Sequence, residues 1–574
     1  MSEEKKMTGY PSIDKPWLKF YSEEAINTPL PKCTIYEYLY ENNKDHLDDK
    51  AINYYGNKIS YGELFKNINI LANTFIRKGV QCGDSVAVCL PSMPEAVYAI
   101  YALNLIGAIP NMLDPRYNEK LLSYCMDGLN AKIIITYDGC YEKLLKMDSN
   151  SLPEIVVLVS PLLSAPLSVK LVASLKIKKI TPQASNHVVY NDFVDATFSK
   201  VKNPVKNRKL DECAVIIHTG GTTGNPKGVM LSNNSINSIA HQYKMLVNPQ
   251  RGETLLDIIP PFASYGLCTS IHMPLSFGLT IDMIPKFDAD EFGDLLHKHK
   301  PNYVMGVPNF YEGMITNKKL IREDMSYLIS AACGGDSMST ATEEKINTFL
   351  VAHNSKAKID MGYGMSEVSA TAGVCFGQMH SYGSVGVPFV KTEFKIVNPD
   401  NSEELSYNQI GEICISGPGM MVGYYNDDEL TNKTIKIHTD GKKWVHTGDL
   451  GRIDEHGFLY HEGRIKRLIV RYDGFKIYPV AIEQVILKQD NVLSCAVVKG
   501  LVSGLGAVAR AYIVLKDNKY DVLDDVLALC KKELAERSIP YSFDFVESLP
   551  LTSIGKIDYR ALEKMVEEME HKNE

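Results

Sequence analysis

The sequence predicts a large N-terminal α/β domain with a β-rich subdomain, followed by a small α+β domain. Three observations support this. The 574 residues exceed what one hydrophobic core usually supports. Short β-branched runs alternate with helical patterns through most of the chain. The pattern changes after Gly411 and again after Arg464. The contents of 45% hydrophobic and 23% charged residues are those of an ordinary globular protein.

The N-terminal part alternates between the two kinds of element. Residues 85–88 and 132–136 read as strands, and residues 61–78 and 94–105 read as helices. The alternation recurs at 155–159 and 214–217, and again within 254–310 and 327–349. Alternating strands and helices predict parallel sheets with helices on their faces.

The C-terminal part has a different sequence pattern. Short strands with glycine turns, at 412–416 and 457–460, predict the β-rich subdomain. Beyond Arg464, helices at 480–488 and 522–537 and strands at 492–498 and 509–515 predict an α+β module of about a hundred residues.

Composition excludes several classes of protein. The formal charge of −8 argues against a nucleic-acid binder, which needs a basic face. The twelve cysteines include no C-x-x-C pair and no nearby histidine couple, so their spacing indicates neither a zinc site nor a disulfide framework. Reduced thiols, and an N-terminus without an apolar signal core, predict a cytoplasmic protein. Prolines and charges interrupt the apolar stretches 87–113 and 155–177, so neither predicts a transmembrane helix.

The most distinctive motif runs from Thr219 to Gly228, between the strand at 214–217 and an expected helix. Glycine lets backbone amides approach phosphate oxygens, while threonine hydroxyls and Lys227 add donors and charge. A Walker loop would need Ser or Thr directly after the lysine, and Gly228 stands there. The alternative is a Gly/Thr-rich turn without a ligand. The residues of the motif are Thr219, Gly220, Gly221, Thr222, Thr223, Gly224, Asn225, Pro226, Lys227 and Gly228.

Four more motifs follow in order: 361–367 (MGYGMSE), 446–449 (HTGD), 463–466 (GRIK) and 553–557 (SIGKI). With them the sequence closely resembles the adenylate-forming superfamily of acyl-CoA synthetases, adenylation domains and luciferases, from about residue 35 to 565. It is closest in type to AMP-forming fatty acid–CoA ligases. The resemblance implies ATP, Mg²⁺ and coenzyme A as cofactor and co-substrates, and a carboxylic acid as substrate. It also implies an AMP-binding domain at 1–464, a hinge at 465–466 and a mobile domain at 467–574.

The resemblance also implies the site residues. Catalytic roles fall on Lys556, Glu367, Lys227 and Thr219, with Thr219 and Glu367 holding the metal. The nucleotide set comprises Thr219, Gly220, Gly221, Thr222, Thr223, Gly224, Lys227, Gly334, Gly335, Asp336, Gly362, Tyr363, Gly364, Ser366, Asp449, Tyr460, Arg464 and Lys556. Lys466 would be the hinge residue, and Gly474 and Phe475 would line the coenzyme A tunnel.

Physical chemistry fits several of these roles. The Glu367 carboxylate is a hard ligand suited to magnesium, and the flat ring of Tyr363 suits adenine. The Asp449 carboxylate could accept both ribose hydroxyls, and the Lys556 ammonium suits the α-phosphate. Each has a simpler alternative: a solvated glutamate, a core ring, a turn-capping aspartate and a surface lysine. His218 and His446 flank motifs and are expected to be ordinary packed histidines.

Several alternatives stay open. The acyl acceptor is expected to be coenzyme A, with a carrier protein or no acceptor as the alternative. Apolar residues at 234–246 and 265–276 favour a medium- or long-chain fatty acid, with an aryl acid as the alternative. Residues 162–180 could form an interfacial helix that contacts membranes, or a helix packed on the main domain. A homodimer is left open.

Overall fold

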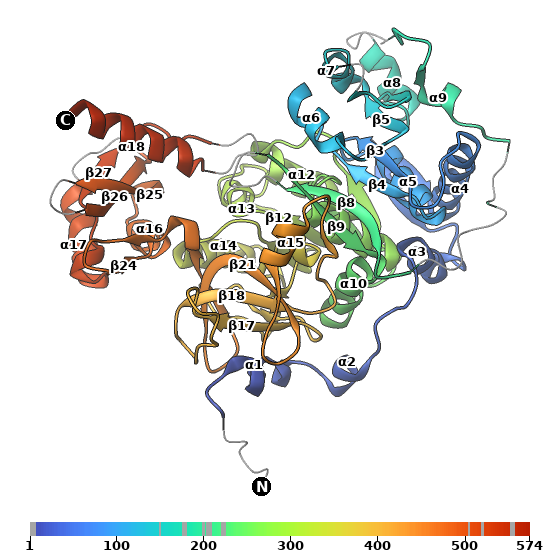
Figure 1. Cartoon of the computed structure of the whole chain (residues 1–574). Helices are drawn as coiled ribbons and strands as arrows, with labels where there is room; N and C mark the ends of the chain where they lie inside the picture. Colours follow the sequence, from blue (N-terminus) through green and yellow to red (C-terminus); the bar gives the residue numbers. More distant parts are fainter. Residues whose placement is uncertain are drawn as a thin grey trace.

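The computed structural model describes residues 7–148, 151–174, 181–197, 201, 209–219, 225–502, 506–517, 522–551 and 557–573. Figure 1 shows a large body and a smaller body that carries the C-terminus. This is the predicted α/β architecture. The sequence indicated parallel sheets but not how many, and two α/β sheets are present in the large body.

The first sheet has eight strands in the order β19-β9-β8-β4-β3-β5-β6-β7, and the strands from β8 to β7 run parallel. α5 is buried along its whole length, so its apolar residues face neighbours on every side. The strands are β3 (Ser85–Cys89), β4 (Ile109–Met112), β5 (Ile133–Tyr137), β6 (Ile155–Val159), β7 (His187–Val189), β8 (Cys213–Thr219), β9 (Lys227–Ser232) and β19 (Gly423–Tyr424). The helices are α3 (Ile35–Asn43), α4 (Tyr61–Arg77), α5 (Pro94–Leu105), α6 (Glu119–Met126), α7 (Tyr141–Leu144), α8 (Leu167–Ser174), α9 (Tyr190–Phe193) and α10 (Asn233–Val247).

The second sheet has nine strands in the order β16-β15-β14-β13-β12-β10-β11-β1-β2. Its centre is parallel, and β1 from the start of the chain pairs in parallel with β11, with Ile52 opposite Ile281. The strands are β1 (Lys50–Tyr54), β2 (Asn57–Ser60), β10 (Thr254–Asp257), β11 (Thr280–Met283), β12 (Tyr303–Gly306), β13 (Ser330–Cys333), β14 (Ile359–Tyr363), β15 (Gly373–Val374) and β16 (Val387–Pro388). The helices are α11 (Met273–Ser276), α12 (Phe292–His299), α13 (Pro308–Ile315) and α14 (Thr340–Ala352).

The β-rich subdomain is a five-stranded antiparallel sheet in the order β17-β18-β21-β20, with β22 on β21. It begins at Glu393, earlier than the change of sequence pattern after Gly411 had indicated. One face packs its apolar side chains into a core that includes Ile413, Ile415 and Val445. The elements are β17 (Glu393–Val397), β18 (Gly411–Ser416), α15 (Asp428–Thr434), β20 (Ile435–Ile437), β21 (Lys443–Ile453) and β22 (Leu459–Arg464). The short helices α1 (Pro11–Asp14) and α2 (Glu23–Asn27) precede the large body, and α1 contacts β17.

The smaller body is the predicted α+β module. Its three-stranded sheet, β25-β26-β27, packs against α16 and α17 around an apolar core of its own. The expected helix 522–537 ends at Glu533, where Leu534 adopts extended backbone angles. The elements are β23 (Ile469–Val470), β24 (Lys476–Ile477), α16 (Pro479–Ile486), β25 (Val492–Val502), β26 (Gly506–Leu515), α17 (Leu523–Glu533), β27 (Ser542–Phe545) and α18 (Tyr559–Asn573).

Candidate active site

The Gly/Thr-rich motif lies between two antiparallel strands. Thr219 ends β8 and is paired with Lys227, which begins β9. The helix expected after the motif, at 234–246, is α10 (Asn233–Val247), but the strand β9 that precedes it was not predicted. Val229 and Leu231 alternate as buried residues of a strand, and Ser232 then caps α10 by accepting a hydrogen bond from the Ser235 amide. Residues Gly220, Gly221, Thr222, Thr223 and Gly224 lie outside the described residues.

Glu367 and Lys227 meet around Tyr424, a residue that the sequence analysis did not select. The Tyr424 hydroxyl donates to Glu367 Oε1 over 2.6 Å, and the Lys227 ammonium lies 5.2 Å from the centre of the Tyr424 ring. Burial, followed by the charge of Glu367, raises the pKa of Tyr424, so the phenol stays protonated and can donate. Tyr424 reaches this position because β19 adds to the edge of β9. A two-residue strand leaves no periodic pattern by which a sequence could reveal it.

Asp449 is the centre of a second polar group. Its Oδ2 accepts a hydrogen bond of 2.8 Å from the Tyr363 hydroxyl, and its Oδ1 lies 3.0 Å from Nε of Arg464. Asp449 and Arg464 are directly opposite each other on β21 and β22. His461, which the sequence analysis did not select, places Nε2 4.0 Å from the same Oδ1.

The electrostatics of Asp449 suit a carboxylate that binds hydroxyl groups. Burial by itself would raise its pKa, but His461, Arg464 and Tyr363 together lower it, so the group is ionised at neutral pH. Oδ1 is buried and accepts no hydrogen bond from any described residue, because Arg464 approaches it as an ion pair without hydrogen-bond geometry. An ionised, buried oxygen that accepts no hydrogen bond fits a ribose hydroxyl.

The two glycine motifs lie at the carboxyl ends of the neighbouring parallel strands β13 and β14. In open α/β sheets this edge is where ligands bind. A side chain on Gly334 would lie 3.3 Å from the Gly362 carbonyl oxygen, and one on Gly364 would overlap the Ala370 carbonyl. Gly335 has φ +82°, which favours glycine. These loops therefore require glycine for close backbone approach.

Beside these glycines, Ser366 and Asp336 make different contacts. The Ser366 hydroxyl lies 2.9 Å from that of Ser264. Burial raises the pKa values of Glu483 and Tyr559 in the smaller body, and the charge of Asp336 acts in the same direction.

The other predicted residues are not gathered around Asp449 or Glu367. The Tyr460 hydroxyl contacts Ser381 and Asp454. Gly474 occupies the turn between β23 and β24 with φ +78°, and a side chain there would meet nothing within 4 Å. Phe475 lies 5.8 Å from the Arg537 guanidinium. Lys556 lies outside the described residues.

The link between the two bodies has an anchor on each side of Lys466. Arg464 is paired with Asp449 of the large body. Arg467 is tied to the smaller body: Nη2 lies 2.5 Å from Glu483 and 3.2 Å from the Val497 carbonyl, and the guanidinium lies 3.5 Å from the centre of the Tyr559 ring. Glu483 is buried, and burial raises its pKa against the opposing charge of Arg467.

His218 is the packed histidine that the sequence predicted. Its Nε2 lies 2.7 Å from Asn111 Oδ1, and burial lowers its pKa to about 4. A neutral ring with one polar partner fits a structural role. His446 is different, because it lies in a cluster with a cysteine and a second histidine that is considered below.

Comparisons with known proteins identify the family of the chain. The family model "AMP-binding enzyme" matches residues 39–425, and the model "AMP-binding enzyme C-terminal domain" matches residues 481–556. A long-chain-fatty-acid–CoA ligase of Bacillus subtilis (strain 168) is 30% identical over 562 residues, which cover 96% of this chain and 97% of that protein. The 4-coumarate–CoA ligase CCL1 of Humulus lupulus is 27% identical over 91% of this chain and 92% of its own.

Solved structures share the fold. ATP-bound MatB from Rhodopseudomonas palustris superimposes with a TM-score of 0.79 at 24% identity, over 93% of this chain and 98% of that chain. The anthranilate CoA ligase AuaEII, in complex with anthranoyl-AMP, gives 0.79 at 18% identity over 94% and 98%. The two-body architecture, the ordered motifs and the family matches lead to one conclusion: the chain belongs to the AMP-binding enzymes, the adenylate-forming family of AMP-forming acid–CoA ligases.

Proposed function

We propose that this enzyme joins a carboxylic acid to coenzyme A in two steps at one site. The acid would first attack the α-phosphorus of ATP, giving an acyl-adenylate and pyrophosphate. The thiol of coenzyme A would then attack the acyl carbon and release AMP. The observation that carries the proposal is Oδ1 of Asp449, a buried acceptor beside the Tyr363 ring that receives no hydrogen bond from the described residues. A ribose and an adenine could bind there together.

The charges around Glu367 support the first step. ATP and a carboxylate are both anions, so their approach needs positive charge. Glu367 and Thr219 would hold Mg²⁺, whose chemistry there is to neutralise triphosphate charge. Lys227 and Lys556 would add positive charge on the protein side, and Tyr424 would hold the Glu367 carboxylate in one orientation. Glycines at 220, 221, 224, 334, 335, 362 and 364 would let backbone amides approach the nucleotide.

A substitution at Glu367 tests this assignment. We expect Glu367→Gln to lower the rate of pyrophosphate release at saturating magnesium by at least about a hundredfold, because the metal loses an anionic ligand. Glu429→Gln is the matched control, since Glu429 is an exposed glutamate paired with Lys433. Wild-type rates in Glu367→Gln, with an unchanged melting curve, would exclude the metal role.

The acyl acceptor is proposed to be free coenzyme A. Relatives that align over most of both chains bear names of CoA ligases. The alternative is an enzyme that loads a carrier protein. ATP–pyrophosphate exchange, followed by thioester formation with free coenzyme A, separates the two: exchange without thioester would favour the carrier-loading alternative.

The acid is proposed to be a medium- or long-chain fatty acid, with an aryl acid as the alternative. Ile239, Val368, Ala372 and Met420 help to line a small apolar pocket beside Glu367. Its walls leave no room for an acyl chain or a ring, so either acid would require this lining to open. Initial rates over a panel of fatty and aryl acids decide between them.

Membrane contact is proposed through α8. Leu167, Leu171 and Val172 are 77%, 70% and 66% exposed, an unusual concentration of apolar side chains on one short helix. Residues 175–180, with the lysines of the expected interfacial helix, lie outside the described residues. Among the described residues, no helix combines the length and apolarity needed to cross a bilayer. The twelve cysteines are all free thiols, which supports the proposal of a cytoplasmic location.

A further inference from the structure

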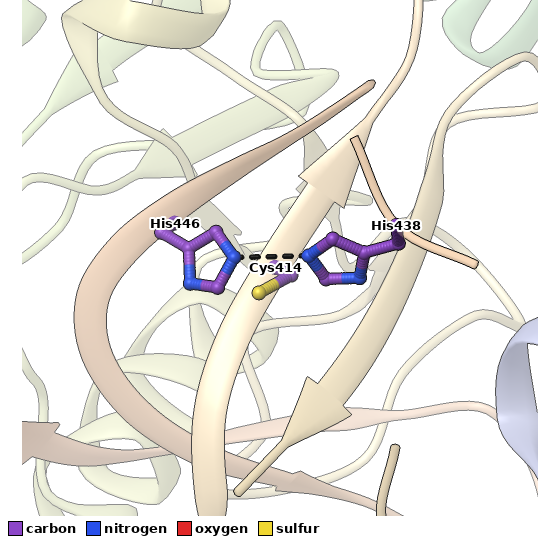
Figure 2. A group of neighbouring side chains, drawn as sticks. All are labelled: Cys414, His438 and His446. Atoms are coloured by element: carbon purple, nitrogen blue, oxygen red, sulfur yellow. Dashed lines mark hydrogen bonds between the residues drawn. The ribbon is translucent and has the colours of Figure 1, made fainter. Parts of the chain in front are cut away.

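The β-rich subdomain brings together three side chains that could hold a metal ion: Cys414, His438 and His446. The cysteine sulfur and one ring nitrogen of each histidine all lie within 4.8 Å of one another. The two Nε2 atoms are 2.9 Å apart, and Figure 2 shows them facing each other with the cysteine sulfur beside them. We call these three residues the Cys–His–His cluster.

The strands explain why residues far apart in the sequence meet here. Cys414 on β18 and His446 on β21 are directly opposite partners, so their side chains leave the same face of the sheet. His438 follows β20, the strand on the other side of β21. The opposite face carries the apolar core with Ile413 and Val445. The cysteine spacing had indicated no zinc site, because the histidines come 24 and 32 positions after Cys414 and only the sheet joins them.

A buried carboxylate supports His446 from behind. Glu412 Oε2 lies 2.7 Å from His446 Nδ1, so this nitrogen carries the proton and Nε2 presents its lone pair to the cluster. Metal-binding histidines usually have this arrangement, in which a carboxylate fixes the tautomer and orients the ring. Glu412 Oε1 accepts a hydrogen bond from the Gly448 amide, next to Asp449.

His438 is also prepared as a ligand. Its ring stacks on Trp444, with 5.8 Å between ring centres and 29° between planes. His438 is only partly buried, whereas Cys414 is fully buried, which leaves an entry path on the His438 side.

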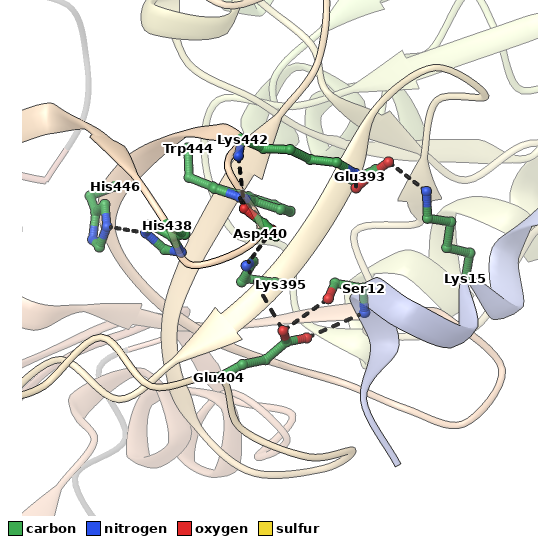
Figure 3. A network of polar contacts seen from close by, with 10 residues as sticks. All are labelled: Ser12, Lys15, Glu393, Lys395, Glu404, His438, Asp440, Lys442, Trp444 and His446. Carbon is green, nitrogen blue, oxygen red and sulfur yellow. Dashed lines mark hydrogen bonds and ion pairs between the residues drawn. The ribbon is translucent and has the colours of Figure 1, made fainter. Parts of the chain in front are cut away.

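The charges near the cluster are compatible with a divalent cation. Lys395 lies opposite Cys414 on β17, and it is paired with Asp440 at 2.9 Å and with Glu404 at 3.9 Å. Figure 3 shows this network, in which Glu404 also contacts Ser12 of the N-terminal segment. A divalent ion with the Cys414 thiolate and Glu412 would be electrically neutral.

We propose that the Cys–His–His cluster is a zinc-binding site, with Cys414 Sγ, His438 Nε2 and His446 Nε2 as ligands and Glu412 as the partner of His446. Sulfur and imidazole nitrogen are the ligands that Zn²⁺ prefers. Binding displaces the Cys414 thiol proton to solvent and leaves a fourth position for water. Tetrahedral bond lengths place such ligand atoms ~3.4–3.6 Å apart, so the two nitrogens, now 2.9 Å apart, separate slightly on binding.

The bound ion would join β18, β21 and the segment after β20. Through Glu412 and the Gly448 amide it would also hold the backbone that leads into Asp449. The competing interpretation needs no ion: His438 donates its Nε2 proton to His446 Nε2, and the histidines are a hydrogen-bonded pair.

Metal content of the full chain distinguishes the two interpretations. The purified protein is incubated with zinc sulfate, dialysed against metal-free buffer and analysed by inductively coupled plasma mass spectrometry, all in a Cys82→Ser background that removes the exposed thiol. We expect about one zinc ion per chain. Cys414→Ser and His438→Gln should weaken zinc binding at least ~100-fold, and Glu412→Gln ~10–100-fold.

Cys375→Ser is the matched control, because Cys375 is equally buried and lies outside the cluster. Cobalt gives an independent reading: its thiolate charge-transfer absorption should be present in the control and absent in Cys414→Ser. Melting curves without metal show whether each variant folds, and the partly exposed His438 provides a variant that keeps the core intact. The proposal is overturned if the wild type retains no zinc, or if Cys414→Ser and Cys375→Ser retain equal amounts.

Discussion

Tyr424→Phe is the sharpest test of the site around Glu367. The substitution removes one hydroxyl and leaves a ring of the same size, so the Lys227 contact with the ring survives. The lost interaction is a 2.6 Å hydrogen bond from the hydroxyl to the Glu367 carboxylate. Without it the carboxylate can rotate away from the orientation in which it would hold magnesium.

The size of the effect follows from the kind of bond. Hydrogen bonds to charged groups contribute about 1.5–3 kcal/mol, and removing a partner that orients a metal ligand usually costs ~10–100-fold in metal affinity. The two figures agree, because each 1.4 kcal/mol corresponds to about tenfold. We therefore expect the magnesium concentration for half-maximal activity to rise ~10–100-fold. The rate at saturating magnesium should change only a few-fold, since the ligand itself remains.

The assay is ATP–pyrophosphate exchange over a magnesium series at fixed ATP. Tyr425→Phe is the matched control: it removes the hydroxyl of the adjacent tyrosine, which donates to the Gly128 carbonyl over 2.9 Å. Equal magnesium midpoints for the two variants, with both proteins folded, would refute the positioning of Glu367 by Tyr424. A lower saturating rate with an unchanged midpoint would also refute it, because it would place Tyr424 outside metal binding.

Two further predictions concern the smaller body and the surface. Lys556→Ala should abolish adenylation, while thioester formation from supplied acyl-adenylate survives. Gly474→Leu should leave adenylation intact and abolish thioester formation. The control is Gly56→Leu, which changes another open turn glycine with positive φ and should affect neither step. Loss of both half-reactions in equal measure in Lys556→Ala and Gly474→Leu would refute domain alternation. Replacing Leu167 and Leu171 by Glu should reduce sedimentation with anionic liposomes several-fold; equal sedimentation of wild type and variant would dismiss membrane contact.

Regular elements were the part of the fold that the sequence predicted best. α5 and β6 have the predicted bounds, Pro94–Leu105 and Ile155–Val159, because a helix-starting proline and a continuous apolar run rich in β-branched residues are strong local signals. β9 was missed, because a glycine- and threonine-rich motif before a polar segment resembles a helix start. Only pairing with β8 and the added β19 shows that Lys227–Ser232 is a strand.

The candidate site was predictable where its residues belong to a recognisable motif. Asp449 and Arg464 come from two such motifs, and they do lie together. His461 and Tyr424 were not predictable, because strand pairing rather than local sequence brings them to these groups. The Cys–His–His cluster follows the same logic. Its ligands come from three neighbouring segments of one sheet, and rules based on the spacing of cysteines along a chain do not detect such a site.

The contacts on either side of Lys466 have a consequence for how the smaller body could turn. Arg464 belongs to the large body and Arg467 to the smaller one, so only Ile465 and Lys466 lie between the two anchors. Two residues provide roughly four soft backbone dihedrals. Fixing them costs about 2–4 kcal/mol of conformational entropy, far less than a long flexible linker would lose. If the smaller body rotates between the two half-reactions, it would then sample few orientations, and the entropic cost of fixing each orientation would be small.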